Sequence, residues 1–406
     1  MAARKPRILW ANAYCMLDTS SGASMSVRRM LKQLAQTGAE VEVLGATIFD
    51  AVAGAALLPQ DDVWAGDGQA VRVKDGPLTH LLVKTQSTKR DDMTAVESDV
   101  WFGLFRRLLD EFRPDIVFFY GGRALDMLAV AEAKSRGVPS AAYLANGNYK
   151  GTRWCRDVDV ILTDSQATAG FYKDTLGIEV QPVGKFLYPE EVCADNHSRE
   201  NILLINPSLA KGAGVALQLA LMLEEQRPDI PLEVVESRGA WQPLVQSVLE
   251  KLGGEGGHLT NVRVTHHVVD MRPVYGRARL LLAPSLWWES GARVLVEAML
   301  NGIPAIVTDK GGSPEMIQNA GVELQLPETF HEPPYAKIPG RKMLQPVVDR
   351  IIRFYDDEDH YQAYVQRAYE VAKGRHDIAV STRRLWNALQ PLLAQGAGDF
   401  EVRLEA

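Results

Sequence analysis

Residues 278–315 read ARLLLAPSLWWESGARVLVEAMLNGIPAIVTDKGGSPE, and this stretch decides the fold. The apolar run from Ala278 to Pro284 predicts a buried strand, and the apolar side chains at positions 294, 295, 298 and 299 recur at helical spacing. A second strand is expected from Ile303 to Asp309, and a glycine-rich turn then leads into another helix. This alternation is typical of a parallel sheet with helices on its faces.

Two glutamates in this stretch, Glu289 and Glu297, have seven residues between them. We expect Glu289 on the turn between strand and helix and Glu297 inside the helix. Positions eight apart along a helix are separated by roughly 12 Å, whereas the paired carboxylates of glycosidases lie about 5 to 9.5 Å apart. The spacing therefore argues against a hydrolase and favours contacts with two parts of one long ligand. The plain alternative is two solvated charges.

Several turns that open helices are suited to binding a phosphate. The unpaired backbone N–H groups and the positive end of a helix both attract an anion. One such turn follows the strand expected at Ile202 to Ile205, and its lysine can neutralise a diphosphate. We therefore predict one phosphate-binding site whose candidate residues are Asn206, Ser208, Lys211, Ser290, Gly291, Ala292, Gly311 and Gly312.

The chain is long enough for two domains, because its 406 residues exceed the size at which a single core stops growing. The first domain is expected over residues 1–187, the second over residues 200–375, and the segment from Tyr188 to Asn201 has linker composition. In both domains strands alternate with helix-length segments, which predicts the α/β class with two Rossmann-like, doubly wound parallel sheets. The expected strands are 7–11, 41–44, 116–119, 141–144 and 160–162, then 202–205, 232–235, 262–265, 278–283 and 305–307.

Residues 278–320 resemble the donor-site signature of glycosyltransferase family 4, which comprises retaining enzymes of the GT-B fold. The resemblance includes the spaced glutamates, the Glu-Ala pair at 297–298, Gly-x-Pro at 302–304 and Gly-Gly-x-Pro-Glu at 311–315. It implies two domains facing a central cleft, with the acceptor bound by the first and a nucleoside diphosphate sugar by the second. It also implies that a helix at about 377–395 packs back on the first domain.

The resemblance assigns roles to individual residues. Glu289 would contact the transferred sugar, Glu297 the ribose and Lys211 the diphosphate. Where the family has an arginine slightly upstream of the lysine, this chain has Asn206, so Arg238 or Arg293 is the candidate replacement.

The first domain also departs from the family. Its glycine pair is represented by Gly22 and Ala23, and the histidine near the donor sugar is absent. Asn146 or Asn148 can hydrogen-bond a sugar hydroxyl there, but neither can act as an acid or a base at neutral pH.

The function implied is retaining transfer of a sugar from a UDP- or GDP-sugar to a glycan, lipid-linked or protein acceptor. In the family the leaving diphosphate is thought to take the acceptor proton, so Lys211, Glu289 and Asn146 are the candidate catalytic residues. No Asp-x-Asp element ends a strand and no metal-type cluster is visible, so a metal-independent reaction without a cofactor is expected. The alternatives are a non-catalytic, sugar-nucleotide-binding subunit of a glycosylation complex and a dinucleotide oxidoreductase, although the latter's glycine fingerprint is missing.

Composition narrows the partners and the location. The formal charge of −7 argues against nucleic acid as a partner. The three cysteines lack metal-type spacing and indicate a reducing cytoplasm, and no window approaches the roughly 20 apolar residues of a membrane helix. A helix capped at Ser98 carries Trp101, Phe105, Leu108 and Phe112 on one face. It is interpreted as packed core, the alternative being a surface for a lipid-linked acceptor at the inner face of the membrane.

Overall fold

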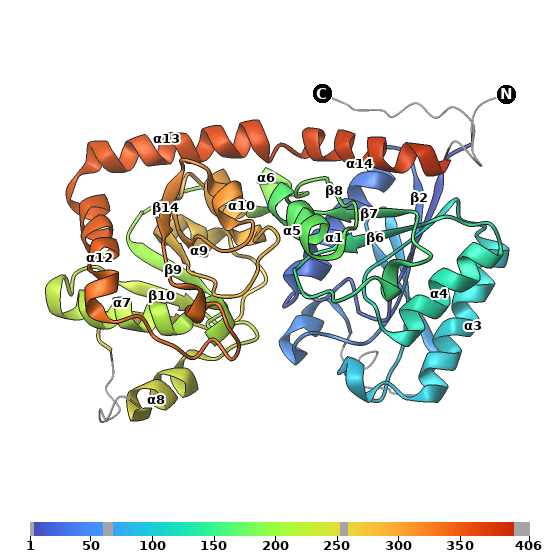
Figure 1. The fold of residues 1–406 in the computed structure, drawn as a ribbon, viewed down its shortest axis with the longest axis horizontal. Coiled ribbons are helices and arrows are strands. Elements are labelled where there is room, and N and C mark those ends of the chain that lie inside the picture. Colours follow the sequence, from blue (N-terminus) through green and yellow to red (C-terminus); the bar gives the residue numbers. More distant parts are fainter. Residues whose placement is uncertain (1–3, 60–67, 252–258, 394–406) are drawn as a thin grey trace. The chain divides into compact units, whose positions relative to one another are not determined.

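The computed structural model describes residues 4–59, 68–251 and 259–393, and the chain divides into two compact units (Figure 1). The first unit contains the described residues up to Phe186 and those from Ile378 onward, and the second runs from Leu187 to Asp377. The long helix expected at about 377–395 is α14, which belongs to the first unit, and its expected last residues, 394 and 395, lie outside the described residues.

The sheet of the first unit has the strand order β3-β4-β2-β1-β5-β6-β7-β8. Its strands pair in parallel except for the antiparallel pair β3 and β4 at one edge. The strands are β1 (Arg7–Ala11), β2 (Glu40–Ala46), β3 (Ala70–Asp75), β4 (Leu78–Val83), β5 (Ile116–Phe119), β6 (Ser140–Leu144), β7 (Val160–Thr163) and β8 (Gln181–Pro182).

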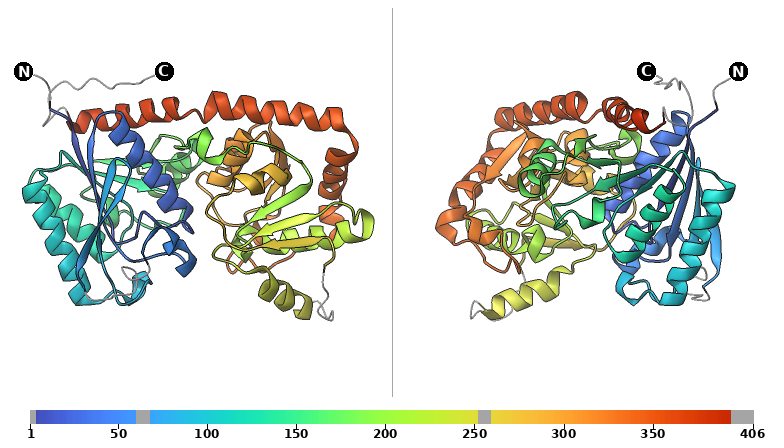
Figure 2. Two further views of the ribbon diagram at one scale, coloured as in Figure 1. Left: turned by 180° about the vertical axis from the view of Figure 1, so that it is seen from behind. Right: turned by 45° about the vertical axis from the view of Figure 1, so that its right-hand side comes forward.

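Helices cover both faces of this sheet because its central strands are apolar on both sides. Along β1, Ile8 and Trp10 pack against α1 and α14, whereas Leu9 and Ala11 pack on the opposite face against α3 and α4. Helices α3 and α4 lie side by side on that face in each view (Figure 2). The helices are α1 (Gly22–Gln36), η1 (Val52–Leu57), η2 (Arg90–Asp92), α3 (Ala95–Glu111), α4 (Ala124–Ser135), η3 (Arg153–Cys155), α5 (Gln166–Leu176) and α14 (Ile378–Leu393).

Helix α3 begins earlier than expected. Its N-cap is Thr94, whose side chain accepts a hydrogen bond from the Glu97 backbone N–H while the Glu97 side chain accepts from the Thr94 backbone N–H. This reciprocal capping box fixes the start of the helix, so the expected cap at Ser98 was wrong. Trp101 and Phe105 are fully buried, as the packed-core interpretation predicts.

The second unit contains a six-stranded parallel sheet in the order β11-β10-β9-β12-β13-β14. The strands are β9 (Asn201–Ile205), β10 (Leu232–Val235), β11 (Val262–Thr265), β12 (Ala278–Ala283), β13 (Ala305–Thr308) and β14 (Gly321–Leu324). The helices are α6 (Pro189–Val192), η4 (Leu209–Lys211), α7 (Ala213–Gln226), α8 (Trp241–Lys251), α9 (Arg272–Arg277), α10 (Arg293–Leu300), α11 (Ser313–Ile317), η5 (Glu328–Phe330), α12 (Arg341–Asp356) and α13 (Glu358–Arg375).

The segment with linker composition packs onto the second unit. Val192 is buried in its core, and the Asn301 side chain bonds to the carbonyl of Val192 and to the backbone N–H of Ala194. Polar composition gives no sign of these contacts, because they come from the end of a helix more than a hundred residues away along the chain. Among the helices that the structure describes, none is long and apolar enough to cross a bilayer.

Each sheet has a point at which the strand order reverses. In the first unit this point lies between β1 and β5, and in the second between β9 and β12. Loops that leave the carboxyl ends of strands at such a point diverge, and the crevice between them is where α/β sheets bind ligands. The candidate residues of the second domain lie mostly on the loops after β9, β12 and β13.

Candidate active site

Three loops of the second unit are joined by backbone contacts at the carboxyl ends of β9, β12 and β13. The backbone N–H groups of Leu286 and Trp287 both donate to the carbonyl of Ala210, at 2.9 and 3.2 Å. The Gly312 N–H donates to the carbonyl of Glu289 at 2.7 Å, so it is not available to a ligand as the sequence analysis expected. Residues from three distant segments are thus held as one rigid group.

The side chains of Lys211 and Glu289 meet at the centre of this group. The ammonium of Lys211 forms an ion pair with Oε1 of Glu289 and lies 5.1 Å from the centre of the Trp287 ring. The same carboxylate oxygen accepts from Ser285 Oγ at 2.8 Å and from Trp287 Nε1 at 2.6 Å. A buried carboxylate is therefore paired with a lysine 78 positions away in sequence.

These contacts decide the charge of Glu289. Burial alone would raise the pKa of the carboxyl, but the Lys211 charge and the three hydrogen bonds outweigh burial and lower the pKa below its ordinary value. Glu289 is consequently an anion at neutral pH. The site therefore presents a carboxylate and a cation side by side, which suits a ligand with both hydroxyl and phosphate groups.

Glu297 lies inside α10, as predicted, and is buried. Its Oε2 accepts from the hydroxyl of the fully buried Tyr275, and its Oε1 accepts from Nε of Arg293, one helical turn earlier. The Arg293 side chain is only 10% exposed, and its Nη1 has no hydrogen-bond partner among the residues that the structure describes. Arg293 therefore has donor capacity left over, which favours it over the exposed Arg238 as a partner for an anion.

The other candidate residues of the second unit fix the conformations of the loops after β9, β12 and β13. Asn206 adopts a left-handed backbone with φ 61°, and its Oδ1 accepts from the Gly239 N–H at 3.2 Å. Ser208 caps the short helix η4. Ser290 and Gly291 are buried, and Ala292 is the N-cap of α10, where its methyl group leaves the first-turn N–H groups uncapped. Gly311, with φ 71°, lets the loop approach within van der Waals range of Glu289.

Gly212 is the tightest of these contacts, and its replacement gives a direct test of the loop arrangement. A Cβ at this position would lie 1.9 Å from the carbonyl oxygen of Pro284, and φ is 77°. We expect Gly212→Ala to lower the free energy of unfolding by about 2–4 kcal/mol, measured by urea denaturation. Gly374→Ala, where nothing lies within 4 Å, is the control and should be neutral or stabilising. Equal stability of the two variants would contradict this close packing of the two loops.

The first unit holds two further predicted residues. Gly22 is the first residue of α1, and a Cβ there would meet no atom within 4 Å. Asn146 follows β6, where its Oδ1 accepts from the Asn148 N–H at 3.0 Å and its carbonyl accepts from the Tyr172 hydroxyl at 2.6 Å. Asn146 therefore braces its own loop.

Two buried acids of the first unit were not predicted from the sequence. Asp164 follows β7, pairs with Lys185 at 2.6 Å and accepts from the Tyr143 hydroxyl. Asp126 lies near the carboxyl end of β5, where it accepts from the Arg123 N–H at 3.0 Å. Asp164 directly follows a strand of the parallel sheet, and Asp126 lies in the first turn of the helix that follows β5. These positions were the signal that could have identified the two acids.

Burial raises the pKa of Asp126 from 3.8 to about 6, although the Arg123 N–H opposes the shift. Between these values the folded protein binds a proton that the unfolded chain has lost, so the free energy of unfolding falls as pH rises. We expect Asp126→Asn to gain stability relative to wild type by about 3 kcal/mol between about pH 4 and pH 7. Thermal unfolding across this range, with the exposed Asp174→Asn as the control, checks it. A difference independent of pH would contradict the raised pKa.

The chain is similar to known proteins in both sequence and structure. Residues 196–371 match the family model described as "Glycosyl transferases group 1", and they lie within the second unit. Spore coat protein SA of Bacillus subtilis (strain 168) is 27% identical over 127 residues, which is 30% of this chain and 33% of that protein. The chain thus aligns with about a third of the length of this curated relative.

Solved structures resemble nearly the whole chain. Sucrose-phosphate synthase from Thermosynechococcus elongatus superposes with a TM-score of 0.72 at 12% identity, covering 97% of this chain and 100% of that one. The Anabaena protein HepE in complex with UDP-glucose superposes with a TM-score of 0.65 at 15% identity, covering 95% and 99%. The chain has the GT-B fold, as predicted. The family match over residues 196–371 supports a glycosyltransferase.

Proposed function

We propose that the protein is a retaining glycosyltransferase of family 4 that moves a sugar from a nucleoside diphosphate sugar to an acceptor. The observation that carries the proposal is the ion pair between Lys211 and Glu289 at the switch point between β9 and β12. A half-buried lysine and a buried carboxylate at the carboxyl ends of adjacent parallel strands provide separate contacts for a phosphate and for a sugar. The Anabaena neighbour was solved with UDP-glucose, which supports a UDP-sugar as donor, with a GDP-sugar as the second choice.

The diphosphate would bind between Lys211 and the first turn of α10. Ala292 provides no side-chain cap for that turn, in which the Leu295 N–H donates to the Ala292 carbonyl, and Arg293 contributes the unpaired Nη1. Arg293 would bind the phosphate that the family's upstream arginine binds. Asn206, which occupies that position here, cannot do so, because its side chain is neutral and accepts a hydrogen bond from the Gly239 N–H. Fixed donors of this kind stabilise the charge that develops on a departing diphosphate.

The two glutamates would hold the sugar and the ribose. All three donors to Glu289 converge on Oε1, so Oε2 is the oxygen that we expect to accept from the sugar hydroxyls. In Glu297 each carboxylate oxygen already accepts from one side chain, and each retains a lone pair for a ribose hydroxyl. Glu289 thus acts near the reacting carbon and Glu297 on the nucleotide.

The transfer step needs no protein base in this proposal. The bond between the anomeric carbon and the diphosphate oxygen breaks as the acceptor oxygen bonds to the same face of that carbon, and the acceptor proton passes to the departing diphosphate. Lys211 and Arg293 supply the positive charge that a divalent ion would otherwise provide, so the reaction is proposed to be metal-independent.

The first unit would present the acceptor, which is a glycan, a lipid-linked sugar or a protein. The open space beside Gly22 and the braced Asn146 loop support this assignment. Asn146 would hydrogen-bond a sugar hydroxyl. The enzyme is proposed to act in the cytoplasm, and contact with the inner face of the membrane would accompany a lipid-linked acceptor.

A thermal-shift panel of nucleoside diphosphates and their sugars tests the proposal. A ligand at 100 times its dissociation constant adds about 2.7 kcal/mol to stability, so the matching base should give a clear shift. Arg293→Ala should reduce the shift, whereas Arg341→Ala, at an exposed arginine that begins α12, should not. Absence of a shift with every nucleotide would contradict the proposal. A shift without turnover of any donor would indicate a binding subunit instead.

A further inference from the structure

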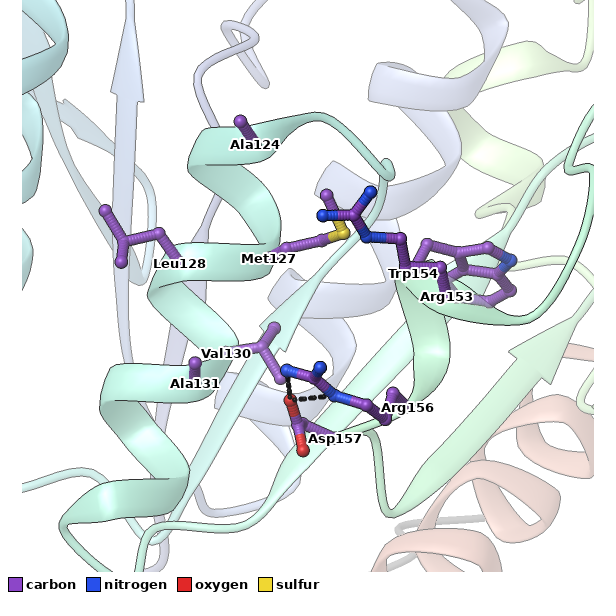
Figure 3. Close-up of a pocket in the computed structure, with 9 residues that line it drawn as sticks. All are labelled: Ala124, Met127, Leu128, Val130, Ala131, Arg153, Trp154, Arg156 and Asp157. Carbon is purple, nitrogen blue, oxygen red and sulfur yellow. Dashed lines mark hydrogen bonds and ion pairs between the residues drawn. The ribbon is translucent and has the colours of Figure 1, made fainter.

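A pocket of about 280 Å³ lies in the first unit between α4 and η3 (Figure 3). It is separate from every residue assigned above to the donor or to the acceptor. Helix α4 forms one wall, and the segment from Arg153 to Asp157 forms the other. The lining residues are Ala124, Met127, Leu128, Val130, Ala131, Arg153, Trp154, Arg156 and Asp157.

The α4 wall of the pocket is apolar. Ala124, Met127, Leu128 and Ala131 recur at spacings of three and four, which places them on one face of the helix. Leu128 is 50% exposed, although burying a leucine is worth roughly 1.5–3 kcal/mol. The opposite wall includes Trp154. An apolar stripe that remains open to solvent in this way favours an apolar ligand.

The rim of the pocket carries surplus positive charge. Asp157 accepts from Arg156 at 2.8 Å and from Lys134 at 3.0 Å, so two cations share one carboxylate, and their hydrogen bonds hold the pKa of Asp157 low. The guanidinium of Arg153 has no hydrogen bond or ion pair with any residue that the structure describes, and the side chain extends from η3 toward α4 (Figure 3). The free guanidinium is a fork of donors suited to a phosphate or a carboxylate.

We propose that this pocket binds a small amphipathic anion, in which a short alkyl chain or a single ring carries one phosphate or carboxylate. The apolar part would lie along Met127 and Leu128, and Arg153 would bind the anionic group. The size follows from the volume, which falls just below the roughly 300–1,000 Å³ typical of sites for larger ligands. This site goes beyond the proposed transfer reaction and does not depend on it.

The pocket is connected to the loop that carries Asn146. The Trp154 ring lies 4.7 Å from that of Tyr149, centre to centre, and the Tyr149 hydroxyl accepts from the Gly121 N–H at 2.9 Å. The Tyr149 N–H in turn bonds to the Tyr172 hydroxyl, which holds the Asn146 carbonyl. An occupant would therefore rest against the aromatic group that fixes the carboxyl ends of β5 and β6.

Calorimetric titration of the full chain with butyl, hexyl and octyl phosphate tests the proposal. Affinity should rise about fourfold for each methylene that enters the pocket. Hexyl phosphate should bind about tenfold more tightly than hexanol, because the charge-assisted hydrogen bonds of the phosphate are added to apolar burial. It should exceed inorganic phosphate by the fourfold factor for each methylene that is buried. Arg153→Ala should remove that tenfold advantage, and Leu128→Asp should weaken every member of the series.

Lys150→Ala is the matched control, because it removes an exposed positive charge from the loop just before η3 without touching the pocket lining. All of these substitutions are at exposed positions, so the variants are expected to fold, which their unfolding curves verify. Equal weakening by Arg153→Ala and Lys150→Ala would show attraction to surface charge only and would overturn the proposal. An affinity independent of chain length would overturn it as well.

Discussion

Replacing Lys211 by alanine is expected to lower the rate of nucleoside diphosphate release from the donor by about 100-fold or more, the scale seen when one preorganised donor is lost. Lys211 lies on the loop that follows β9, at the switch point between β9 and β12, and it is held by Glu289 and the Trp287 ring. Its loss would leave both the departing diphosphate and the buried Glu289 carboxylate without this partner. The rate is measured from nucleoside diphosphate released at saturating donor.

Lys342→Ala provides the comparison for this experiment, because Lys342 is an exposed lysine of the same unit, on α12. Its rate should match that of wild type, and addition of a chelator should leave the wild-type rate largely unchanged. Strict dependence on a divalent ion would overturn the role given to Lys211. Comparable losses in both lysine variants would do the same.

The two glutamate variants should fail in different ways. Glu289→Gln is expected to lower turnover by about 100-fold while free nucleotide binds nearly as before, because its contacts are with the transferred sugar. Glu297→Gln should weaken the binding of nucleotide and of nucleotide sugar alike, by about 10- to 100-fold. The variant loses the charge-assisted contacts to the ribose and the ion pair with Arg293. Titration of free nucleotide and steady-state kinetics separate the two effects.

Tyr275→Phe serves as a control for Glu297, because it removes one donor to the carboxylate while leaving the charge in place. Its effect on nucleotide affinity should be smaller than that of Glu297→Gln. If Glu289→Gln and Glu297→Gln reduced free-nucleotide affinity equally, the assignment of Glu289 to the transferred sugar and of Glu297 to the ribose would be wrong.

Local sequence patterns predicted most of the strands and helices. The apolar runs that became β9 and β12 were predicted to the residue or nearly so, because buried parallel strands are apolar on both faces. The start of α3 was missed although Thr94 and Glu97 form a capping box, because Ser98, one residue further on, is also a favourable N-cap residue. The antiparallel strand β3 was missed because exposed and half-buried residues alternate along it without a continuous apolar run.

The candidate site was predictable as a set of loops but not as a set of contacts. Strand-to-helix turns identify Lys211 and Glu289 separately, whereas their ion pair depends on β9 and β12 being neighbours in the sheet. Likewise, nothing local indicates that Tyr275 bonds to Glu297, because that contact joins two helices across the folded unit. The need for glycine at position 212 arises from the Pro284 carbonyl of another loop.

The most direct test is to follow transfer by proton NMR, using the donor selected by the stability panel, and to read the anomeric configuration of the first product from its coupling constant. The proposed chemistry predicts that the configuration of the donor is retained, and that Lys211→Ala abolishes most of the signal while the folded protein persists. An inverted product, or no transfer and no hydrolysis of any donor that binds, would contradict it.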